Sequence, residues 1–123
     1  MKNKILLIED DTFIREIYQS ELTRNGMEVT AYSSAEEGIQ ALEQKTFDLL
    51  LLDIMLPGMN GLEALKKIKQ NPKTKDLDVV ILTNLGQETV VKEGLDTGAV
   101  GYLIKASYNP DQIVTEVKKF LSD

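Results

Sequence analysis

Short runs of aliphatic residues recur along the chain, and two of them end in acidic residues. The run at residues 5–8 is followed by Glu9 and Asp10, and the run at residues 49–52 is followed by Asp53. Four aliphatic residues bounded by charge are typical of strands that are buried on both faces of a parallel sheet. The carboxyl ends of such strands lie along one sheet edge, where open α/β sheets bind ligands. If the two strands are neighbours, the three carboxylates converge in one pocket.

Converging carboxylates predict the chemistry of that pocket. Like charges held close together repel, so one carboxyl group must bind its proton more tightly or a cation must join the cluster. Ligands that are all oxygen suit a hard cation, and Mg²⁺ suits them better than the softer metals. The cluster therefore predicts a magnesium site and phosphoryl chemistry.

Strand and helix signals alternate along the whole chain. Five β/α units with short connections predict one domain over residues 1–123, a doubly wound parallel sheet with five helices on its two faces. The sequence leaves the strand order open, but the flavodoxin-like order 2-1-3-4-5 places the first and third strands, which end in carboxylates, side by side. We expect this order, with strands at residues 4–8, 28–32, 48–52, 79–82 and 100–104.

The composition excludes several classes of site. The chain has no Cys and no His, so disulfides, thiolate metal sites, histidine zinc sites and phosphohistidine are excluded within it. Its net charge of −6 disfavours direct binding of nucleic acid, which needs a basic surface. We find neither a signal peptide nor a membrane-spanning apolar segment, and we expect a soluble cytoplasmic protein.

Two further polar residues follow predicted strands. Thr83 directly follows the fourth predicted strand, and its hydroxyl could donate to a phosphoryl oxygen. Lys105 follows the fifth predicted strand as a cation near the three acids. Plainer interpretations stay open, because Thr83 is a good strand former, lysines are usually solvated, and Tyr102 fits an ordinary half-buried position. One acid of Asp10 and Asp11 can cap the first helix, and Asp11 is the better candidate.

Taken in order, these residues resemble the receiver domain of two-component response regulators, which has the chemotaxis-regulator fold. The resemblance covers essentially the whole chain, and residues 53–61 are its most specific part. The matching motifs are Ile8-Glu9-Asp10-Asp11, Leu52-Asp53-Ile54-Met55-Leu56-Pro57-Gly58-Met59-Asn60-Gly61, Leu82-Thr83-Asn84 and Gly101-Tyr102-Leu103-Ile104-Lys105.

The resemblance implies a magnesium-dependent phosphoacceptor. Asp53 would accept the phosphoryl group. Mg²⁺ would be held by Asp10, by Glu9 directly or through water, by Asp53 and by the Met55 carbonyl. The protein would be a signalling switch and not an enzyme, since it would catalyse only its own phosphorylation and dephosphorylation.

The resemblance also implies how the signal would be passed on. Thr83 and Lys105 would contact the phosphoryl group, and Tyr102 would act as an aromatic switch that turns inward. That movement would remodel the face formed by the fourth helix, fifth strand and fifth helix. The same face would offer a surface for a homodimer.

The resemblance implies two kinds of partner, a phosphoryl donor and a downstream target. The phosphoryl donor must be a separate molecule, because the chain has no His. It would be the phosphohistidine of a sensor histidine kinase or a small phosphodonor such as acetyl phosphate. The output would be a downstream effector protein or an output domain, with no direct contact to nucleic acid or membrane.

A few positions depart from the family pattern. Ala106 follows Lys105 where the family usually has proline, so the shape of the next loop is left open, and Asn84 stands where a small residue is common. Leu85 and Met55 are apolar at positions that flank the route of the attacking water in this family. We therefore expect slow hydrolysis of the aspartyl phosphate.

Two other classes of protein share parts of this sequence pattern. A flavodoxin-like FMN-binding module would need a phosphate-cradling loop after the first strand, where Glu9, Asp10 and Asp11 would repel phosphate. A Mg²⁺-dependent phosphohydrolase would share the acidic pocket, but it would need a cap or longer loops than this chain has. A yellow purified protein would favour the first, and turnover of a phosphomonoester the second.

Overall fold

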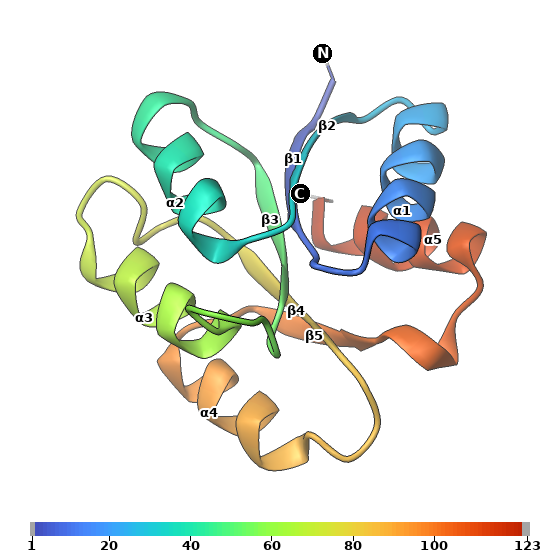
Figure 1. Cartoon of the computed structure of the whole chain (residues 1–123). Helices are drawn as coiled ribbons and strands as arrows, with labels where there is room; N and C mark the ends of the chain where they lie inside the picture. The colour runs from blue at the N-terminus through green and yellow to red at the C-terminus, as the bar shows by residue number, and fades with distance from the viewer. Residues whose placement is uncertain (1, 122–123) are drawn as a thin grey trace.

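The chain forms a five-stranded sheet whose strands are all parallel (Figure 1). The structure is a computed structural model, and it describes residues 2–121. The strand order is β2-β1-β3-β4-β5, which confirms the predicted order and places β1 beside β3. The strands are β1 (Lys4–Ile8), β2 (Glu28–Tyr32), β3 (Leu49–Asp53), β4 (Val79–Thr83) and β5 (Gly101–Ile104).

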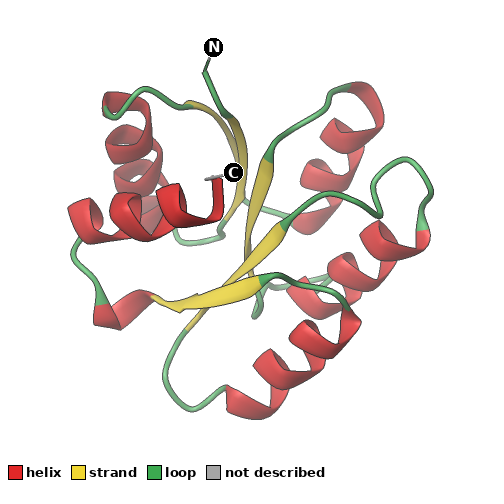
Figure 2. Cartoon of the chain, turned by 180° about the vertical axis from the view of Figure 1, so that it is seen from behind, coloured by secondary structure: helices red, strands yellow, loops and turns green. Residues whose placement is uncertain are grey.

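Helices cover both faces of the sheet. In Figure 1, α2, α3 and α4 lie on one side of the strands and α1 and α5 on the other, and Figure 2 shows the same two layers from behind. The helices are α1 (Thr12–Arg24), α2 (Ala35–Gln44), α3 (Gly61–Gln70), α4 (Glu88–Thr97) and α5 (Pro110–Leu121).

Alternation along the buried strands divides the core into two layers. Leu6 and Ile8 of β1 pack into the cluster that contains residues of α2 and α3, whereas Ile5 and Leu7 pack into the cluster with α1 and α5. Successive side chains of a strand point to opposite faces, so an unbroken aliphatic run supplies both layers. Because β1 and β3 pair in parallel, with Ile8 opposite Leu52, their carboxyl ends lie side by side at one edge.

Polar side chains cap the first turns of three helices. Ser34 caps α2, and Asn60 caps α3 in a reciprocal capping box with Glu63. The Asp11 carboxylate accepts a hydrogen bond from the Ile14 N–H at the start of α1. Asp11 is therefore the capping acid, which leaves Glu9 and Asp10 for another use.

The strand ends differ from the prediction by one residue. Both β3 and β4 extend one position further, so that Asp53 and Thr83 are the last residues of these strands. Asp53 still pairs with Leu82, and the Ile54 N–H donates to the Leu82 carbonyl. The sheet thus holds the backbone of Asp53 itself.

The segment after β5 has a defined shape. A short 3₁₀ helix, η1 (Lys105–Ser107), joins β5 to α5, and no peptide bond within residues 2–121 is cis, so Lys105 and Ala106 are joined by a trans bond. In the same part of the chain, no helix combines the length and hydrophobicity that crossing a membrane would require.

Candidate functional site

Three carboxylates meet where β1 and β3 end. Carboxylate oxygens of Glu9, Asp10 and Asp53 all lie within 4.8 Å of one another. Glu9 is 0 % exposed and Asp53 is 3 % exposed, whereas Asp10 faces solvent. The pairing of β1 with β3 therefore brings together the three acids that the sequence predicted to converge.

Lys105 joins the cluster from the end of β5. Its Nζ donates to Glu9 Oε1 at 2.8 Å and to Asp53 Oδ2 at 3.1 Å. The ammonium and both carboxylates are almost fully buried. Buried charges are tolerated when they are paired and hydrogen-bonded, so these two contacts account for the burial of both acids.

Backbone donors hold the second oxygen of each buried acid. The Asp11 N–H donates to Glu9 Oε2 at 3.0 Å, and the Met55 N–H donates to Asp53 Oδ1 at 3.0 Å. The Arg15 guanidinium donates to the Glu9 carbonyl at 2.9 Å, which ties the loop after β1 to α1. Each buried carboxylate is thus oriented at both oxygens.

Gly61 allows α3 to start directly against Asp53. A Cβ added at Gly61 would lie 2.2 Å from the Asp53 carbonyl oxygen and 2.6 Å from the Ile54 Cα. The Gly61 N–H also donates to the Ile54 carbonyl. Only a residue without a side chain permits this approach, so Gly61 fixes the loop that follows Asp53.

Burial and pairing change the pKa values of two groups in the cluster. Burial raises the pKa of Glu9 to about 7, although the hydrogen bonds from Lys105 and the Asp11 N–H lower it; the charge of Asp53 raises it further. Burial lowers the pKa of Lys105, but the hydrogen bond to Glu9 and the charge of Asp53 outweigh this and raise it overall. Lys105 therefore remains charged at neutral pH.

The donor set fits a magnesium ion. Mg²⁺ binds oxygen ligands at about 2.0–2.1 Å, which places neighbouring ligands roughly 3–4 Å apart. The spacing of the carboxylate oxygens is compatible with this arrangement. Three ionised carboxylates and one ammonium carry a formal charge of −2, which a divalent cation offsets. All the side-chain ligands are oxygen, as a hard cation requires.

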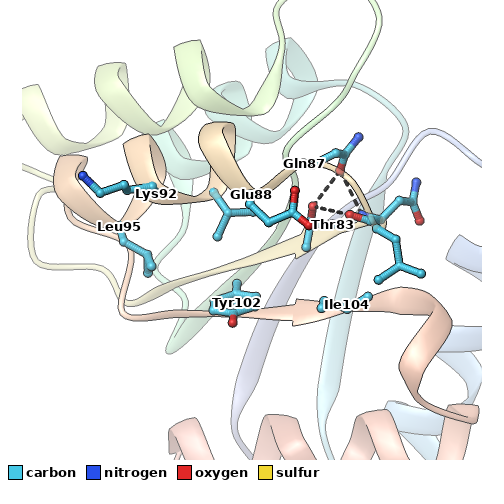
Figure 3. A pocket seen from close by; sticks show the side chains of 10 residues that line it. Thr83, Gln87, Glu88, Lys92, Leu95, Tyr102 and Ile104 are labelled. Carbon is cyan, nitrogen blue, oxygen red and sulfur yellow. Dashed lines mark hydrogen bonds between the residues drawn. The ribbon is translucent and has the colours of Figure 1, made fainter.

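Thr83 is buried at the end of β4, but its hydroxyl contacts α4 rather than the acids. Thr83 Oγ1 donates to Gln87 Oε1 at 2.6 Å, and the Asn84 N–H donates to the same oxygen at 2.9 Å (Figure 3). Sequence reasoning missed Gln87. The sequence feature that could have indicated it is the position of Gln87, a residue with a side-chain acceptor that stands four residues after Thr83, directly before α4.

Tyr102 and Met55 are more exposed than the acids. The Tyr102 side chain is 47 % exposed and lines a cavity of about 240 Å³ between α4 and β5 (Figure 3). Met55 is 52 % exposed, and its backbone N–H is the group that contacts Asp53. The contact predicted from the Met55 carbonyl to a metal stays a prediction.

Known proteins are similar to this chain in both sequence and fold. The family model of the response regulator receiver domain matches residues 5–118. The phosphate regulon transcriptional regulatory protein PhoB of Escherichia coli is 36 % identical over 118 residues, which are 96 % of this chain and 51 % of PhoB. The chain thus spans about half the length of that curated relative.

Solved structures agree with the family match. The chemotaxis response regulator CheY4 of Vibrio cholerae superposes with a TM-score of 0.90 at 26 % identity, covering 98 % of this chain and 100 % of CheY4. A receiver domain of DrrB described as BeF3-activated gives a TM-score of 0.81 at 30 % identity, covering 98 % of each chain. With the acids, Thr83 and Lys105 at the same sheet edge, these matches show that the chain belongs to the response regulator receiver domain family, whose members serve phosphorylation-dependent signalling.

Proposed function

We propose that the protein is a two-component signalling switch in which Asp53 accepts the phosphoryl group. One observation carries the proposal: Asp53 is buried at the end of β3, between Lys105 Nζ and the Met55 N–H, in a cluster with Glu9 and Asp10. A carboxylate held in this way is oriented to act as a nucleophile toward phosphorus.

The transfer step requires little of the protein beyond positioning and charge. One Asp53 oxygen forms a bond to phosphorus while the bond between phosphorus and the donor's imidazole nitrogen breaks, and that nitrogen keeps the electron pair. Lys105, 3.1 Å from Asp53 Oδ2, offsets negative charge on the transferred group. With acetyl phosphate, a phosphorus–oxygen bond breaks instead.

Glu9, Asp10, Asp53 and the Met55 carbonyl would hold Mg²⁺ beside the acceptor. The ion would supply positive charge at the phosphoryl oxygens when it is bound. Asp10 suits the role of the accessible ligand, because it is the exposed member of the cluster. The buried Glu9 is already engaged by Lys105 and by the Asp11 N–H, so it would bind directly or through water.

The response would spread from Asp53 through β4 and β5. Phosphorylation adds roughly −1.5 to −2 charge at the end of β3. Thr83 would turn its hydroxyl toward the new oxygens, and Tyr102 would move into the cavity between α4 and β5. The face formed by α4, β5 and α5 would then differ between the two states, so that a partner can distinguish them.

The partners follow from this role. A sensor histidine kinase would supply the phosphoryl group, and a downstream effector protein or output domain would read the face formed by α4, β5 and α5. That face would also serve if the protein forms a homodimer. PhoB is a transcriptional regulatory protein about twice as long as the matched region, which supports an output beyond the receiver.

The phosphorylated state should be long-lived, because apolar Met55 and Leu85 cannot orient a water molecule for attack. Both side chains are exposed, Leu85 at 72 %. We expect Met55→Asn to shorten the lifetime of the aspartyl phosphate severalfold, measured by intact mass after removal of the phosphodonor. Val100→Asn, at an exposed apolar position before β5, is the control. Equal lifetimes for wild type and Met55→Asn would contradict this explanation.

Intact-mass spectrometry tests the acceptor. The protein is incubated with acetyl phosphate, with and without Mg²⁺, beside Asp53→Asn and Asp96→Asn, the latter at an exposed position on α4. We expect one phosphoryl adduct that requires Mg²⁺, persists in Asp96→Asn and is absent in Asp53→Asn. An adduct that persists in Asp53→Asn would exclude Asp53 as the acceptor.

A further inference from the structure

The side chain of Gln87 folds back from the start of α4 onto the end of β4. Its Oε1 accepts one hydrogen bond from Thr83 Oγ1 at 2.6 Å and one from the Asn84 N–H at 2.9 Å. Figure 3 shows these contacts beside the cavity that Tyr102 lines. One side-chain oxygen of α4 therefore holds the residue proposed to contact the phosphoryl group.

The direction of the bond between Thr83 and Gln87 follows from its partners. The Asn84 N–H can only donate, so the Gln87 atom that faces it is the carbonyl oxygen and not the amide nitrogen. That oxygen has no proton, so the Thr83 hydroxyl is the donor in the 2.6 Å contact. The Asn84 carbonyl, 3.2 Å from Thr83 Oγ1, is a second and more distant acceptor for the same proton. A threonine hydroxyl has a single proton, which cannot be donated fully to Gln87 and to a phosphoryl oxygen at the same time.

Gln87 is also the residue directly before α4. It occupies the N-cap position, yet its side chain does not cap the helix. By contrast, the side chains of Ser34 and Asn60 accept from N–H groups of the helices that they begin. The side chain of Gln87 is used to hold Thr83 and Asn84, so movement of Thr83 is linked to the first turn of α4.

We propose that Gln87 is a positioning residue that holds Thr83 in the unphosphorylated arrangement and must release it on phosphorylation. This inference rests on the proposed function. A hydrogen bond to an ionised phosphoryl oxygen is about twice as strong as one between neutral groups, so the phosphoryl group wins the competition for the proton. Release then frees the first turn of α4 on the face where Tyr102 lies.

Beryllium fluoride with Mg²⁺, as a probe of the phosphorylated state, tests this competition. Gln87→Met removes the nearer acceptor, keeps much of the side-chain volume and leaves Thr83 Oγ1 only the Asn84 carbonyl at 3.2 Å. Because the stronger of its two hydrogen bonds is gone, releasing Thr83 costs less free energy. We expect Gln87→Met to bind beryllium fluoride roughly two- to tenfold more tightly than wild type, the range given by the net contribution of one hydrogen bond. Thr89→Ala, at an exposed position in the same helical turn, should leave the affinity unchanged.

A double-mutant cycle separates this role from a structural one. Without the Thr83 hydroxyl there is no proton to compete for, so Gln87→Met should not change the affinity in a Thr83→Val background. The Asn84 amide should exchange faster in Gln87→Met in both backgrounds, because it loses its acceptor.

The outcomes distinguish the two proposals. If Gln87→Met binds with wild-type or weaker affinity, or gains affinity equally in the Thr83→Val background, the role of Gln87 is refuted while the switch stands. If wild type itself fails to bind beryllium fluoride in the presence of Mg²⁺, the proposed function is refuted, and the role of Gln87 with it.

Discussion

The two halves of the site are built differently. Where β1 and β3 end, Glu9 and Asp53 are buried, and each of the four carboxylate oxygens of these two residues has a hydrogen-bond donor. Where β4 and α4 meet, Thr83 is held by the side chain of Gln87, and Tyr102 stands half-exposed beside a cavity. We call the first region the acid half and the second the switch half.

The difference matches what each half has to do. Charge stabilisation is most effective when the groups are already in place, because no reorganisation is then needed at the moment of reaction. A response requires an element with two arrangements of similar free energy. Four charge-assisted contacts fix the acid half. Under the proposed mechanism, the switch half would change state when the Thr83 hydroxyl moves its hydrogen bond from Gln87 to the phosphoryl group and the Tyr102 ring enters the cavity.

The largest effect is expected from removing the cation of the acid half. Lys105→Met leaves Asp53 in place but takes away the charge that faces the transferred group, so phosphorylation by acetyl phosphate should slow on the order of 100-fold. The rate is measured by intact mass over time. Lys92→Met, at an exposed position on α4, is the control, and a rate in Lys105→Met within threefold of wild type would contradict the assigned role.

The free energy of unfolding of the protein should depend on pH because Glu9, in the acid half, titrates. Its pKa is raised to about 7, so the folded protein binds this proton more tightly than the unfolded chain. The contribution of Glu9 to the free energy of unfolding therefore falls as pH rises from about 4.5 to about 7, by on the order of 1–3 kcal/mol, and is constant above that.

Urea unfolding in buffer without Mg²⁺ measures this dependence. The stability of wild type relative to Glu9→Gln should decline between pH 5 and pH 7, because the variant lacks the titrating group. A relative stability that rises with pH over this range would show that Glu9 is held as a carboxylate with a lowered pKa instead.

Matched glycine substitutions compare the backbones of the two halves. Gly61→Ala forces a Cβ against the Asp53 carbonyl and should cost about 1–3 kcal/mol. Gly86, in the loop before α4, has open space around it and a φ of +86°, so Gly86→Ala should cost only about 1 kcal/mol. Thermal unfolding gives both losses of stability. A larger loss for Gly86→Ala than for Gly61→Ala would show that the backbone of the switch half, and not that of the acid half, is the more rigid.

The smallest effect on chemistry is expected in the switch half. Tyr102→Ala removes the ring beside the cavity but touches none of the acids, so phosphorylation of Asp53 should stay within about twofold of wild type. The response of the α4–β5–α5 face, followed by amide chemical shifts, should be weakened. Failure of Tyr102→Ala to become phosphorylated would show that Tyr102 is part of the chemical site.

The sequence predicted the acid half better than the switch half, for a physical reason. Buried parallel strands appear as aliphatic runs, and their last residues must lie at one sheet edge, so Glu9, Asp10 and Asp53 could be placed together in advance. Lys105 could be placed by the same argument, because it follows a strand. Each of these positions follows from backbone topology.

The missed features depend on side-chain direction. The sequence does not show that Gln87 turns back to Thr83 instead of pointing into solvent, because both arrangements suit a polar residue at the start of a helix. It also does not show that Arg15 reaches the Glu9 carbonyl, or that burial raises the pKa of Glu9. These depend on packing around each group, which only the folded arrangement provides.

Amide chemical shifts of the Mg²⁺-bound protein, recorded before and after addition of beryllium fluoride, show directly whether the acid half moves the switch half. Beyond the residues next to Asp53, we expect large changes at Thr83, Asn84, the first turn of α4 and Tyr102, with β1, β2 and α1 largely unchanged. Changes confined to the loops after β1 and β3, with Thr83 and Tyr102 unmoved, would contradict the claim that a fixed acid half drives a movable switch half.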